Sequence, residues 1–265
     1  MKKVNKKIIY IIVIIILLIL IGIMAFVFSD KRLDLESKQV NDLYKYLGEV
    51  DIYHCGGLIT YQDKNISIDD ITKENALCMA YYNYKSYSKD IVKEKIKSTS
   101  KNEHNIKICK IGGITFTTED DECSYVKFSK NDINKSFKEI YGEDIKDYKS
   151  FYISSKEACY LEGEEYYCGN AETFTFSLAA EATVYRLMDK AVKKLNGDIV
   201  IYDYYLKASD SKCYTTNNKE IKECNEALNN AKIDAKFVNK YGTLYKHTFK
   251  LNSNNNHYWL KTELA

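Results

Sequence analysis

The hydrophobic pattern of the chain begins with an uninterrupted apolar run over residues 8–28, which contains no charged residue. A helix rises about 1.5 Å per residue, so this run is about 31 Å long and matches a hydrocarbon core about 30 Å thick. We therefore predict a transmembrane helix over residues 8–28, through which the chain contacts the lipid bilayer. A cleaved signal peptide is the alternative, but its apolar region is usually shorter and ends in a small-x-small site, which residues 23–25 match poorly.

The charges on either side of this run predict its orientation. Four lysines and no acid precede it, whereas the lysine and arginine that follow it closely are mixed with acids. Because positively charged flanks stay in the cytoplasm, residues 1–7 are expected to be a cytoplasmic tail and the chain from residue 29 onward to be extracytoplasmic. No second run approaches membrane length. The sequence thus predicts a single-pass protein of the cell membrane.

Helical spacing follows at several places. Residues 29–48 form a juxtamembrane linker and helix, in which apolar residues recur every three to four positions. Thr72 can cap a second helix, and Ser129 with Asp132 forms a capping-box pattern that opens a third helix, which Gly142 can end. The helices expected from these patterns cover residues 35–48, 72–84, 129–142 and 223–229.

Alternating apolar and polar positions bounded by turn residues predict β-hairpins. The strongest signal is the Asn196-Gly197 pair. A helix over residues 179–194 is the alternative, because Ala, Glu, Leu, Met and Lys favour one. The charged residues 89–105 are expected to form a solvated helix end and loop. The expected strands cover residues 106–111 and 114–118, 123–128, 150–161 and 165–169, 183–193 and 198–208, and 243–251 and 257–264.

These elements predict an α+β fold with an antiparallel sheet. We divide the exported part into an α+β region over residues 49–169 and an antiparallel β-rich region over residues 170–265. The pattern F-x3-Y-G occurs at residues 137–142 and again at 237–242. This recurrence suggests that the second region contains a partial repeat of residues 109–168. The alternative is that a helix ending in glycine before a hairpin is a common arrangement.

The cysteines are the clearest sign of how the exported part is stabilised. All eight lie beyond residue 28, and an even number outside the reducing cytoplasm indicates disulfides. Sequential pairing closes short loops. The metal alternative is weak, because no two cysteines have the two-to-four-residue spacing of a zinc knuckle. The expected pairs are Cys55 with Cys78, Cys109 with Cys123, Cys159 with Cys168, and Cys213 with Cys224.

Composition excludes some functions. The formal charge of +2 becomes about −2 once the four lysines before residue 8 are set aside. A near-neutral ectodomain lacks the clustered basic residues that neutralise phosphates, so we expect no nucleic-acid partner. The chain has no proline and 24 tyrosines, a bias typical of an AT-rich bacterial genome.

At residues 198–207 (DIVIYDYYLK) and 237–261 (FVNKYGTLYKHTFK…YWLK), the chain resembles uncharacterised membrane-anchored ectodomains of AT-rich Gram-positive bacteria. The resemblance covers mainly the C-terminal third, with weaker echoes around Cys159 and Cys168. It implies a bent antiparallel sheet that is similar to the cystatin/NTF2-like class. It implies no function, because none is associated with these proteins.

Catalytic motifs are missing from the sequence. The four histidines have no zinc-protease spacing, and no nucleophile elbow, Walker loop or dinucleotide-binding glycine run is present. His54 next to Cys55 resembles an activated thiol, but neighbours in an extended strand point to opposite faces. Asp203, among tyrosines, is either a functional buried carboxylate or a residue on the wet face of a strand. We expect no cofactor.

Tyrosine clusters remain as the binding hint, because tyrosine combines a rigid apolar face with a polar tip. Filling of core and sheet positions by an AT-rich genome is the plainer explanation. The candidate binding residues are Tyr202, Tyr204, Tyr258 and Trp259. We expect a membrane-tethered extracytoplasmic protein that binds an envelope polysaccharide or another surface protein. The alternative is an envelope hydrolase without a recognisable motif.

Overall fold

The computed structural model describes residues 30–49, 55, 64–87, 91–154, 156–171, 183–209, 212–215, 219–228 and 232–265. The predicted transmembrane helix over residues 8–28 lies outside these ranges. Of the pair His54 and Cys55, only Cys55 lies within them. Within the described ranges, no helix combines the length and apolar character needed to cross a bilayer.

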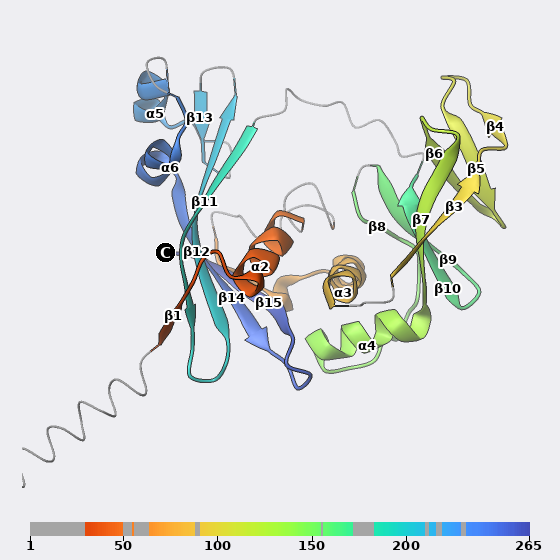
Figure 1. Ribbon diagram of the computed structural model, residues 1–265, viewed down its shortest axis with the longest axis horizontal. Coiled ribbons are helices and arrows are strands. Elements are labelled where there is room, and N and C mark those ends of the chain that lie inside the picture. The colour runs from red at the N-terminus through yellow and green to blue at the C-terminus, as the bar shows by residue number, and fades with distance from the viewer. Residues whose placement is uncertain are drawn as a thin grey trace, which may run out of the picture.

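The described chain forms three antiparallel sheets. The one with the most strands, the larger sheet, has seven, in the order β1-β11-β12-β14-β15-β2, with β13 paired to β12 as well. Its long central strands come from the C-terminal part of the chain, whereas its edge strands β1 and β2 come from the N-terminal part (Figure 1). This sheet therefore joins the two regions into which the sequence was divided. Its strands are β1 (Lys31–Leu33), β2 (Ile66–Ser67), β11 (Thr183–Lys193), β12 (Ile199–Ser209), β13 (Lys212–Tyr214), β14 (Thr243–Leu251) and β15 (His257–Leu264).

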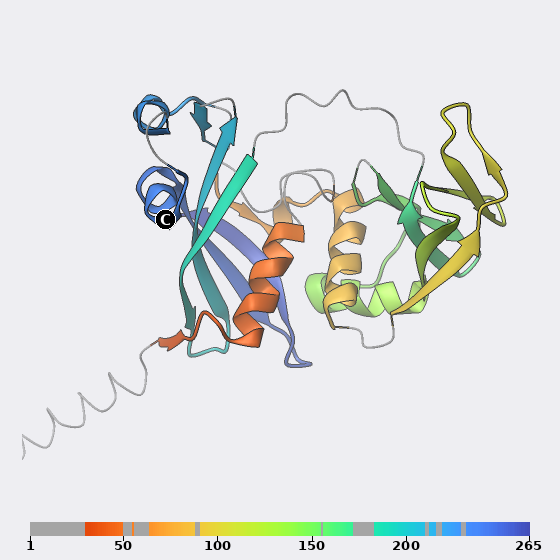
Figure 2. The ribbon, with the colours of Figure 1, turned by 45° about the horizontal axis from the view of Figure 1, so that its top comes forward.

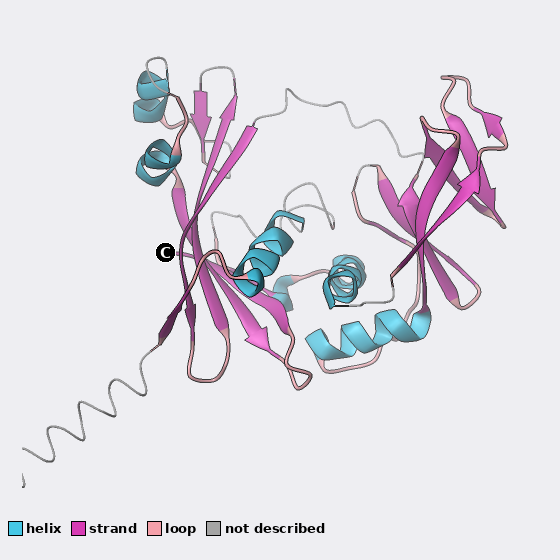
Figure 3. Cartoon of the chain, viewed as in Figure 1, coloured by secondary structure: helices cyan, strands magenta, loops and turns pink. Residues whose placement is uncertain are grey.

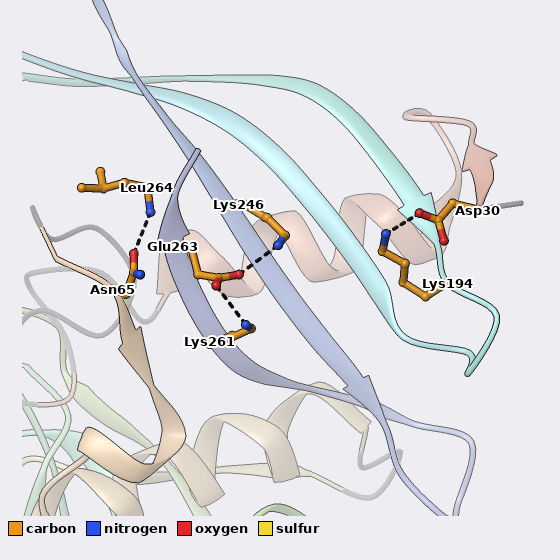
Figure 4. A network of polar contacts seen from close by, with 7 residues as sticks. All are labelled: Asp30, Asn65, Lys194, Lys246, Lys261, Glu263 and Leu264. Atoms are coloured by element: carbon orange, nitrogen blue, oxygen red, sulfur yellow. Dashed lines mark hydrogen bonds and ion pairs between the residues drawn. The ribbon is translucent and has the colours of Figure 1, made fainter.

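Side-chain hydrogen bonds reinforce the strand pairing near the β2 edge of this sheet. Leu264 at the end of β15 donates its backbone N–H to the Asn65 side chain (3.1 Å), next to β2. On the same strand, the Glu263 carboxylate accepts hydrogen bonds from Lys261 (2.9 Å) and Lys246 (3.0 Å), as Figure 4 shows. These bonds lower the pKa of Glu263 below its usual range. The Lys246 bond thus links β14 to β15, whereas the Lys261 bond stays within β15.

Two smaller sheets form the other side of the molecule. One has five strands in the order β3-β7-β10-β9-β8, and the other has three in the order β4-β5-β6. The strands of the five-stranded sheet are β3 (Val92–Lys97), β7 (Glu122–Ser129), β8 (Phe151–Tyr152), β9 (Glu157–Glu162) and β10 (Glu165–Asn170). Those of the three-stranded sheet are β4 (Ser100–Lys101), β5 (Lys107–Ile111) and β6 (Ile114–Thr118).

Three helices lie between the larger sheet and the five-stranded sheet, and one core runs through them (Figures 1 and 2). They are α2 (Lys38–Glu49), α3 (Lys73–Tyr87) and α4 (Lys130–Tyr141), with the 3-10 turn η1 (Ile68–Asp70) before α3. On α2, Tyr46 packs edge-on against Phe249 of β14 (ring centroids 6.1 Å apart). On α3, Tyr81 stacks on Phe128 of β7 (5.5 Å). The helices therefore carry the apolar contact between the two sheets.

Two short helices, α5 (Lys222–Leu228) and α6 (Ala235–Tyr241), lie on the other face of the larger sheet, away from α2 and α3 (Figure 3). They cover a smaller cluster of buried residues around Leu206, Phe237 and Val238. The larger sheet is thus covered by helices on both faces. The predicted α+β class with antiparallel sheets is confirmed.

Local signals for turns and caps are confirmed as well. Ser129 caps α4: Asp132 donates its backbone N–H to the Ser129 hydroxyl, and its carboxylate accepts from the Ser129 backbone (3.1 Å). Gly142 ends α4 in the left-handed conformation (φ 73°), which glycine adopts without steric strain. The Thr72 side chain accepts from the Asn75 backbone (3.3 Å) at the start of α3.

All four predicted disulfides are present, and the cysteines are paired sequentially. Cys159 and Cys168 stand directly opposite each other on β9 and β10, with Cα atoms 4.0 Å apart. The Cα separations in the other pairs are 5.4 Å for Cys55–Cys78, 6.2 Å for Cys109–Cys123 and 5.8 Å for Cys213–Cys224. No described cysteine is free, so none of the eight is available as a zinc ligand.

Two expectations about secondary structure are corrected. Residues 92–97 form an edge strand instead of a loop: exposed Lys93, Lys95 and Lys97 alternate with half-buried Glu94 and Ile96. Charged side chains are common on edge strands because they discourage pairing with other chains. Residues 183–193 form a strand, so the helix considered over residues 179–194 is wrong for that part.

The two F-x3-Y-G segments both lie at helix ends. In α4 the Phe137 and Tyr141 rings are 4.5 Å apart, and in α6 the Phe237 and Tyr241 rings are 4.8 Å apart. Their glycines differ, because Gly142 is left-handed whereas Gly242 has φ −72° and is extended. The chain therefore leaves the two helices in different directions, and residues of the first helix line a pocket.

Candidate functional site

A pocket of about 410 Å³ opens between the start of α3 and the end of α4. Residues 68–77 form one wall and residues 137–149 the other, so two segments far apart in sequence meet here. The apolar lining side chains are those of Ile68, Ile71, Ala76, Leu77, Phe137, Tyr141 and Ile145.

The walls follow from local sequence. In α3, Ala76 and Leu77 are adjacent buried residues in the first turns after the Thr72 cap. In α4, Phe137 and Tyr141 are one turn apart, so their rings lie on one face of the helix. The left-handed Gly142 then turns the chain, and residues 143–149 return along the mouth of the pocket. The capping glycine thus shapes the site.

Tyr141 is the unusual member of this lining. Its hydroxyl is buried and has no hydrogen-bond partner among the described residues. Burial raises the pKa of Tyr141, and the negative charge of Asp69 across the pocket raises it further. A buried polar group without a partner costs about 1–3 kcal/mol. Such a group is uncommon in a folded protein.

The rim of the pocket carries charges of both signs. Lys146 pairs with Glu143 (2.9 Å), which raises the pKa of Lys146. Asp144 accepts from Asn134 (2.9 Å) and pairs with Lys138 (3.1 Å), and these contacts lower the pKa of Asp144. These pairs tie the returning segment to α4 and to itself.

Four further charged residues of the rim form no ion pair with any described residue: Asp69, Lys73, Asp147 and Lys149. Two are acidic and two are basic, so the mouth of the pocket has nearly balanced charge. The pocket therefore combines an aliphatic and aromatic floor, one buried hydroxyl and a rim with both charges available. Such an arrangement suits an uncharged apolar group attached to a chain with mixed polarity.

The tyrosines proposed from sequence lie elsewhere. Tyr258 and Trp259 of β15 are buried in the main core, so a ligand cannot reach them unless the core opens. This burial argues against the binding role expected from the sequence, because the alternating pattern of β15 cannot show that other elements cover both of its faces. Tyr202 and Tyr204 of β12 are half-buried; the Lys190 ammonium lies 4.3 Å from the centre of the Tyr202 ring. None of these four residues lines the pocket beside Tyr141.

Asp203 is part of a buried polar network in the larger sheet. His247 contacts Asp203 through Nε2 (2.8 Å) and Thr262 through Nδ1 (2.8 Å), and Trp259 donates its indole N–H to the Thr262 hydroxyl (2.9 Å). Because the indole can only donate, Thr262 accepts from it and has its own proton left for His247 Nδ1. The imidazole then donates from Nε2 to the Asp203 carboxylate. Every group of this series is satisfied.

A cation completes the network. Arg186 of β11, one of two arginines in the chain, donates to Asp203 through Nε (3.4 Å) and to the backbone oxygen of Tyr44 on α2 (3.2 Å). Its guanidinium stacks on the Tyr44 ring, 4.1 Å from the ring centre. Burial and the nearby Asp203 carboxylate raise the pKa of Tyr44. The network thus attaches α2 to the sheet.

The order of Thr262, His247 and Asp203 resembles the nucleophile, base and acid of a hydrolase. Asp203 and His247 are both 0% exposed, however, and Thr262 is buried as well. A substrate cannot reach the Thr262 oxygen in this arrangement, so the geometry assigns the network to folding. Asp203 therefore lies neither on a solvent-exposed strand face nor at a site that a ligand can reach.

Comparison of the chain with known protein families, with curated proteins and with solved structures finds no match in any of the three. The sequence alone does not predict the pocket, although Phe137, Tyr141 and Gly142 belong to a recurring pattern. The available signal was a pair of aromatic residues spaced one turn apart at the end of a helix, directly before a glycine. The opposite wall of the pocket, in η1 and α3, is visible only in the fold.

Proposed function

We propose that this protein is a membrane-tethered extracytoplasmic binding protein, held by a helix over residues 8–28, whose pocket beside Tyr141 binds a peptide segment of another surface protein. Four disulfides support an oxidising compartment outside the cytoplasm. The apolar run and its basic N-terminal flank support the anchor and its orientation.

One observation carries the binding role: an apolar pocket is lined by Tyr141, whose buried hydroxyl has no hydrogen-bond partner in the described structure. A bound peptide can bury an apolar side chain against Leu77 and Ile145, and a rotation of the Tyr141 ring on binding would bring its buried hydroxyl within reach of a backbone carbonyl or N–H of the peptide. The pairing of an apolar contact with one oriented hydrogen bond is the usual chemistry of specific small sites.

The lining favours a peptide over the envelope polysaccharide that the sequence also suggested. Sugars bind well to flat exposed aromatic faces, whereas this floor is mainly aliphatic and its two aromatic rings pack on each other. The unpaired rim residues Lys73, Lys149, Asp69 and Asp147 offer partners to both charges of a peptide.

A hydrolase remains the alternative function, but none of the described histidines lines this pocket. The cystatin/NTF2-like class likewise remains a proposal, supported by the antiparallel order of the larger sheet.

The binding role is tested with the full-length protein reconstituted in lipid nanodiscs and exposed to solubilised envelope components. A captured component is purified, and its affinity is measured for the wild type and for Ile71→Glu, which places a charge in the half-buried lining. We expect at least about a tenfold loss of affinity, which corresponds to about 1.4 kcal/mol. Tyr141→Phe should weaken binding about two- to tenfold, because it removes one hydrogen bond.

Ile106→Glu is the matched control, because Ile106 is the same residue type but lies outside the pocket and is partly exposed. Equal affinity of Ile71→Glu and the wild type would show that the pocket is not the binding site. Capture of a glycan alone would overturn the peptide as the ligand class.

Protease added to wall-free cells should degrade the chain beyond about residue 31; recovery of the full-length chain would refute the orientation.

A further inference from the structure

The described part of the chain begins at the edge of the larger sheet, directly after the predicted anchor. Strand β1 pairs antiparallel with the end of β11, where Lys31 stands opposite Lys193. One residue earlier, the Asp30 carboxylate forms an ion pair with the Lys194 side chain (Figure 4). The first described residues are therefore fixed to the turn between β11 and β12.

Chain length limits how far this turn lies from the predicted anchor. Asp30 is two positions beyond residue 28, and an extended chain spans at most about 3.6 Å per residue, which gives about 7 Å. The headgroup layer on each side of a bilayer is about 5–8 Å thick. If residues 8–28 span the membrane, Asp30 lies within this layer or at its surface. The ion pair then brings Lys194 to the same depth.

The next residue of the turn is apolar and exposed. Leu195 is 61% exposed, the highest value among the large hydrophobic residues of the described chain. Its neighbours hold the turn: Lys194 donates its backbone N–H to Asp198 O (2.8 Å), and the Asn196 amide donates to the Asp198 side chain (2.7 Å). A rigid polar turn thus presents one leucine at its tip, next to the point where the chain leaves the membrane.

Basic residues surround this tip. The residues Lys31, Arg32 and Lys193 are exposed, and no ion pair joins any of them to a described residue. The acids close by have partners of their own: Asp30 pairs with Lys194, and Asp198 accepts bonds within the turn and from Leu251 (3.0 Å). Exposed lysines and arginines near a bilayer are attracted to anionic headgroups.

We propose that the β11–β12 turn lies in the membrane interface beside the anchor, with Leu195 inserted below the headgroups and Lys31, Arg32 and Lys193 facing anionic lipid phosphates. The partner is the lipid bilayer in which the chain itself is anchored. A second contact of this kind fixes the orientation of the larger sheet on the membrane, which a single flexible tether does not. This inference rests on the proposed anchoring of residues 8–28.

The test uses the full-length protein in lipid vesicles that contain anionic phospholipid. Leu195→Cys is labelled with a fluorophore whose emission shifts to the blue in apolar surroundings. This labelling is feasible because the native cysteines in the described structure are all bridged. Tyr152→Cys is the matched control, because Tyr152 is similarly exposed (55%) but lies on β8 of the five-stranded sheet. Lys193→Cys reports the same edge without altering the turn.

We expect blue-shifted emission at position 195 that is quenched by lipids carrying a nitroxide on the upper acyl chain, just below the headgroups. Position 193 should be quenched more weakly, and position 152 should resemble a label in water. If the protein floats with the vesicles but positions 195 and 193 behave like position 152, the membrane contact is refuted while the anchor stands. If the protein does not float with the vesicles, the anchor itself is refuted, and this inference falls with it.

Discussion

The hydroxyl of Thr262 links two buried groups, and its removal is the sharpest test of the network in the larger sheet. It accepts from the Trp259 indole (2.9 Å) and bonds to His247 Nδ1 (2.8 Å). Thr262→Val keeps the branched shape of the side chain and replaces only the hydroxyl with a methyl group. The change leaves one donor and one acceptor without a partner.

The expected loss of stability follows from these two groups. Each buried group without a partner costs about 1–3 kcal/mol, so the two together cost about 2–6 kcal/mol. The added methyl group gains about 0.8 kcal/mol by burial. Thr262 and His247 are 1% and 0% exposed, so water cannot reach the site to replace the lost bonds. We therefore expect the free energy of unfolding to fall by about 1–5 kcal/mol, out of about 5–15 kcal/mol for a typical domain.

Urea unfolding of the purified full-length protein in detergent, with disulfides intact, measures this change. Trp259 is the single tryptophan of the chain and lies in the network, so its fluorescence reports the transition directly. Thr248→Val is the matched control. Thr248, on the neighbouring strand β14, is a buried threonine as well, but its hydroxyl makes no hydrogen bond with the described residues. It should change stability by less than about 0.5 kcal/mol.

The comparison between the two variants decides the outcome. If Thr262→Val is no less stable than Thr248→Val, the hydroxyl does not complete the network, and the assignment of the His247 tautomer fails with it. A change in the urea dependence without a change in midpoint would instead indicate an altered unfolded state.

Three further outcomes are expected. Ser129→Ala should lower the free energy of unfolding by about 1 kcal/mol in urea unfolding, because it removes the α4 cap on which Asp132 depends; an unchanged midpoint would contradict this role. Burial and the hydrogen bond to Glu94 raise the pKa of Tyr125 to about 12, so this side chain favours the neutral form in the folded protein. Its contribution to stability is then complete below about pH 10 and is lost as the pH rises towards 12, and Tyr125→Phe should flatten the alkaline part of a stability curve measured by circular dichroism. Removal of the Cys159–Cys168 bridge by double serine substitution should cost about 2–4 kcal/mol; non-reducing peptide mapping that joins either cysteine to a third one would refute the pairing.

The local structure was predictable because its causes are local. The Ser129 and Asp132 cap, the Gly142 helix end and the turn at Gly197 each depend on residues within a few positions of one another. The same holds for the bridge between Cys159 and Cys168, since a hairpin brings its two strands together by itself. Sequence therefore predicted most elements, the α+β class and the sequential disulfides.

Charge misled the prediction at β3. Lys93, Lys95 and Lys97 suggested a solvated loop, but their period of two is also that of an edge strand with one exposed face. Pairing with β7 decides between the two, and that partner follows about 30 residues later in the chain. Propensity alone cannot show whether such a partner is available.

The sequence by itself determined the apolar run over residues 8–28, the cysteine pairing and the order of helices and strands, because spacing and side-chain type encode each of these directly. Only the tertiary structure placed Ile68 and Leu77 in the same pocket lining as Tyr141, and Asp203 against His247. Both arrangements join segments more than 40 residues apart. Whether such a side chain ends in water, in a core or in a pocket depends on which surfaces the other elements cover. Tyrosine shows this most clearly: Tyr258 and Tyr141 are the same residue type, yet packing places one in the core and the other in the wall of a pocket.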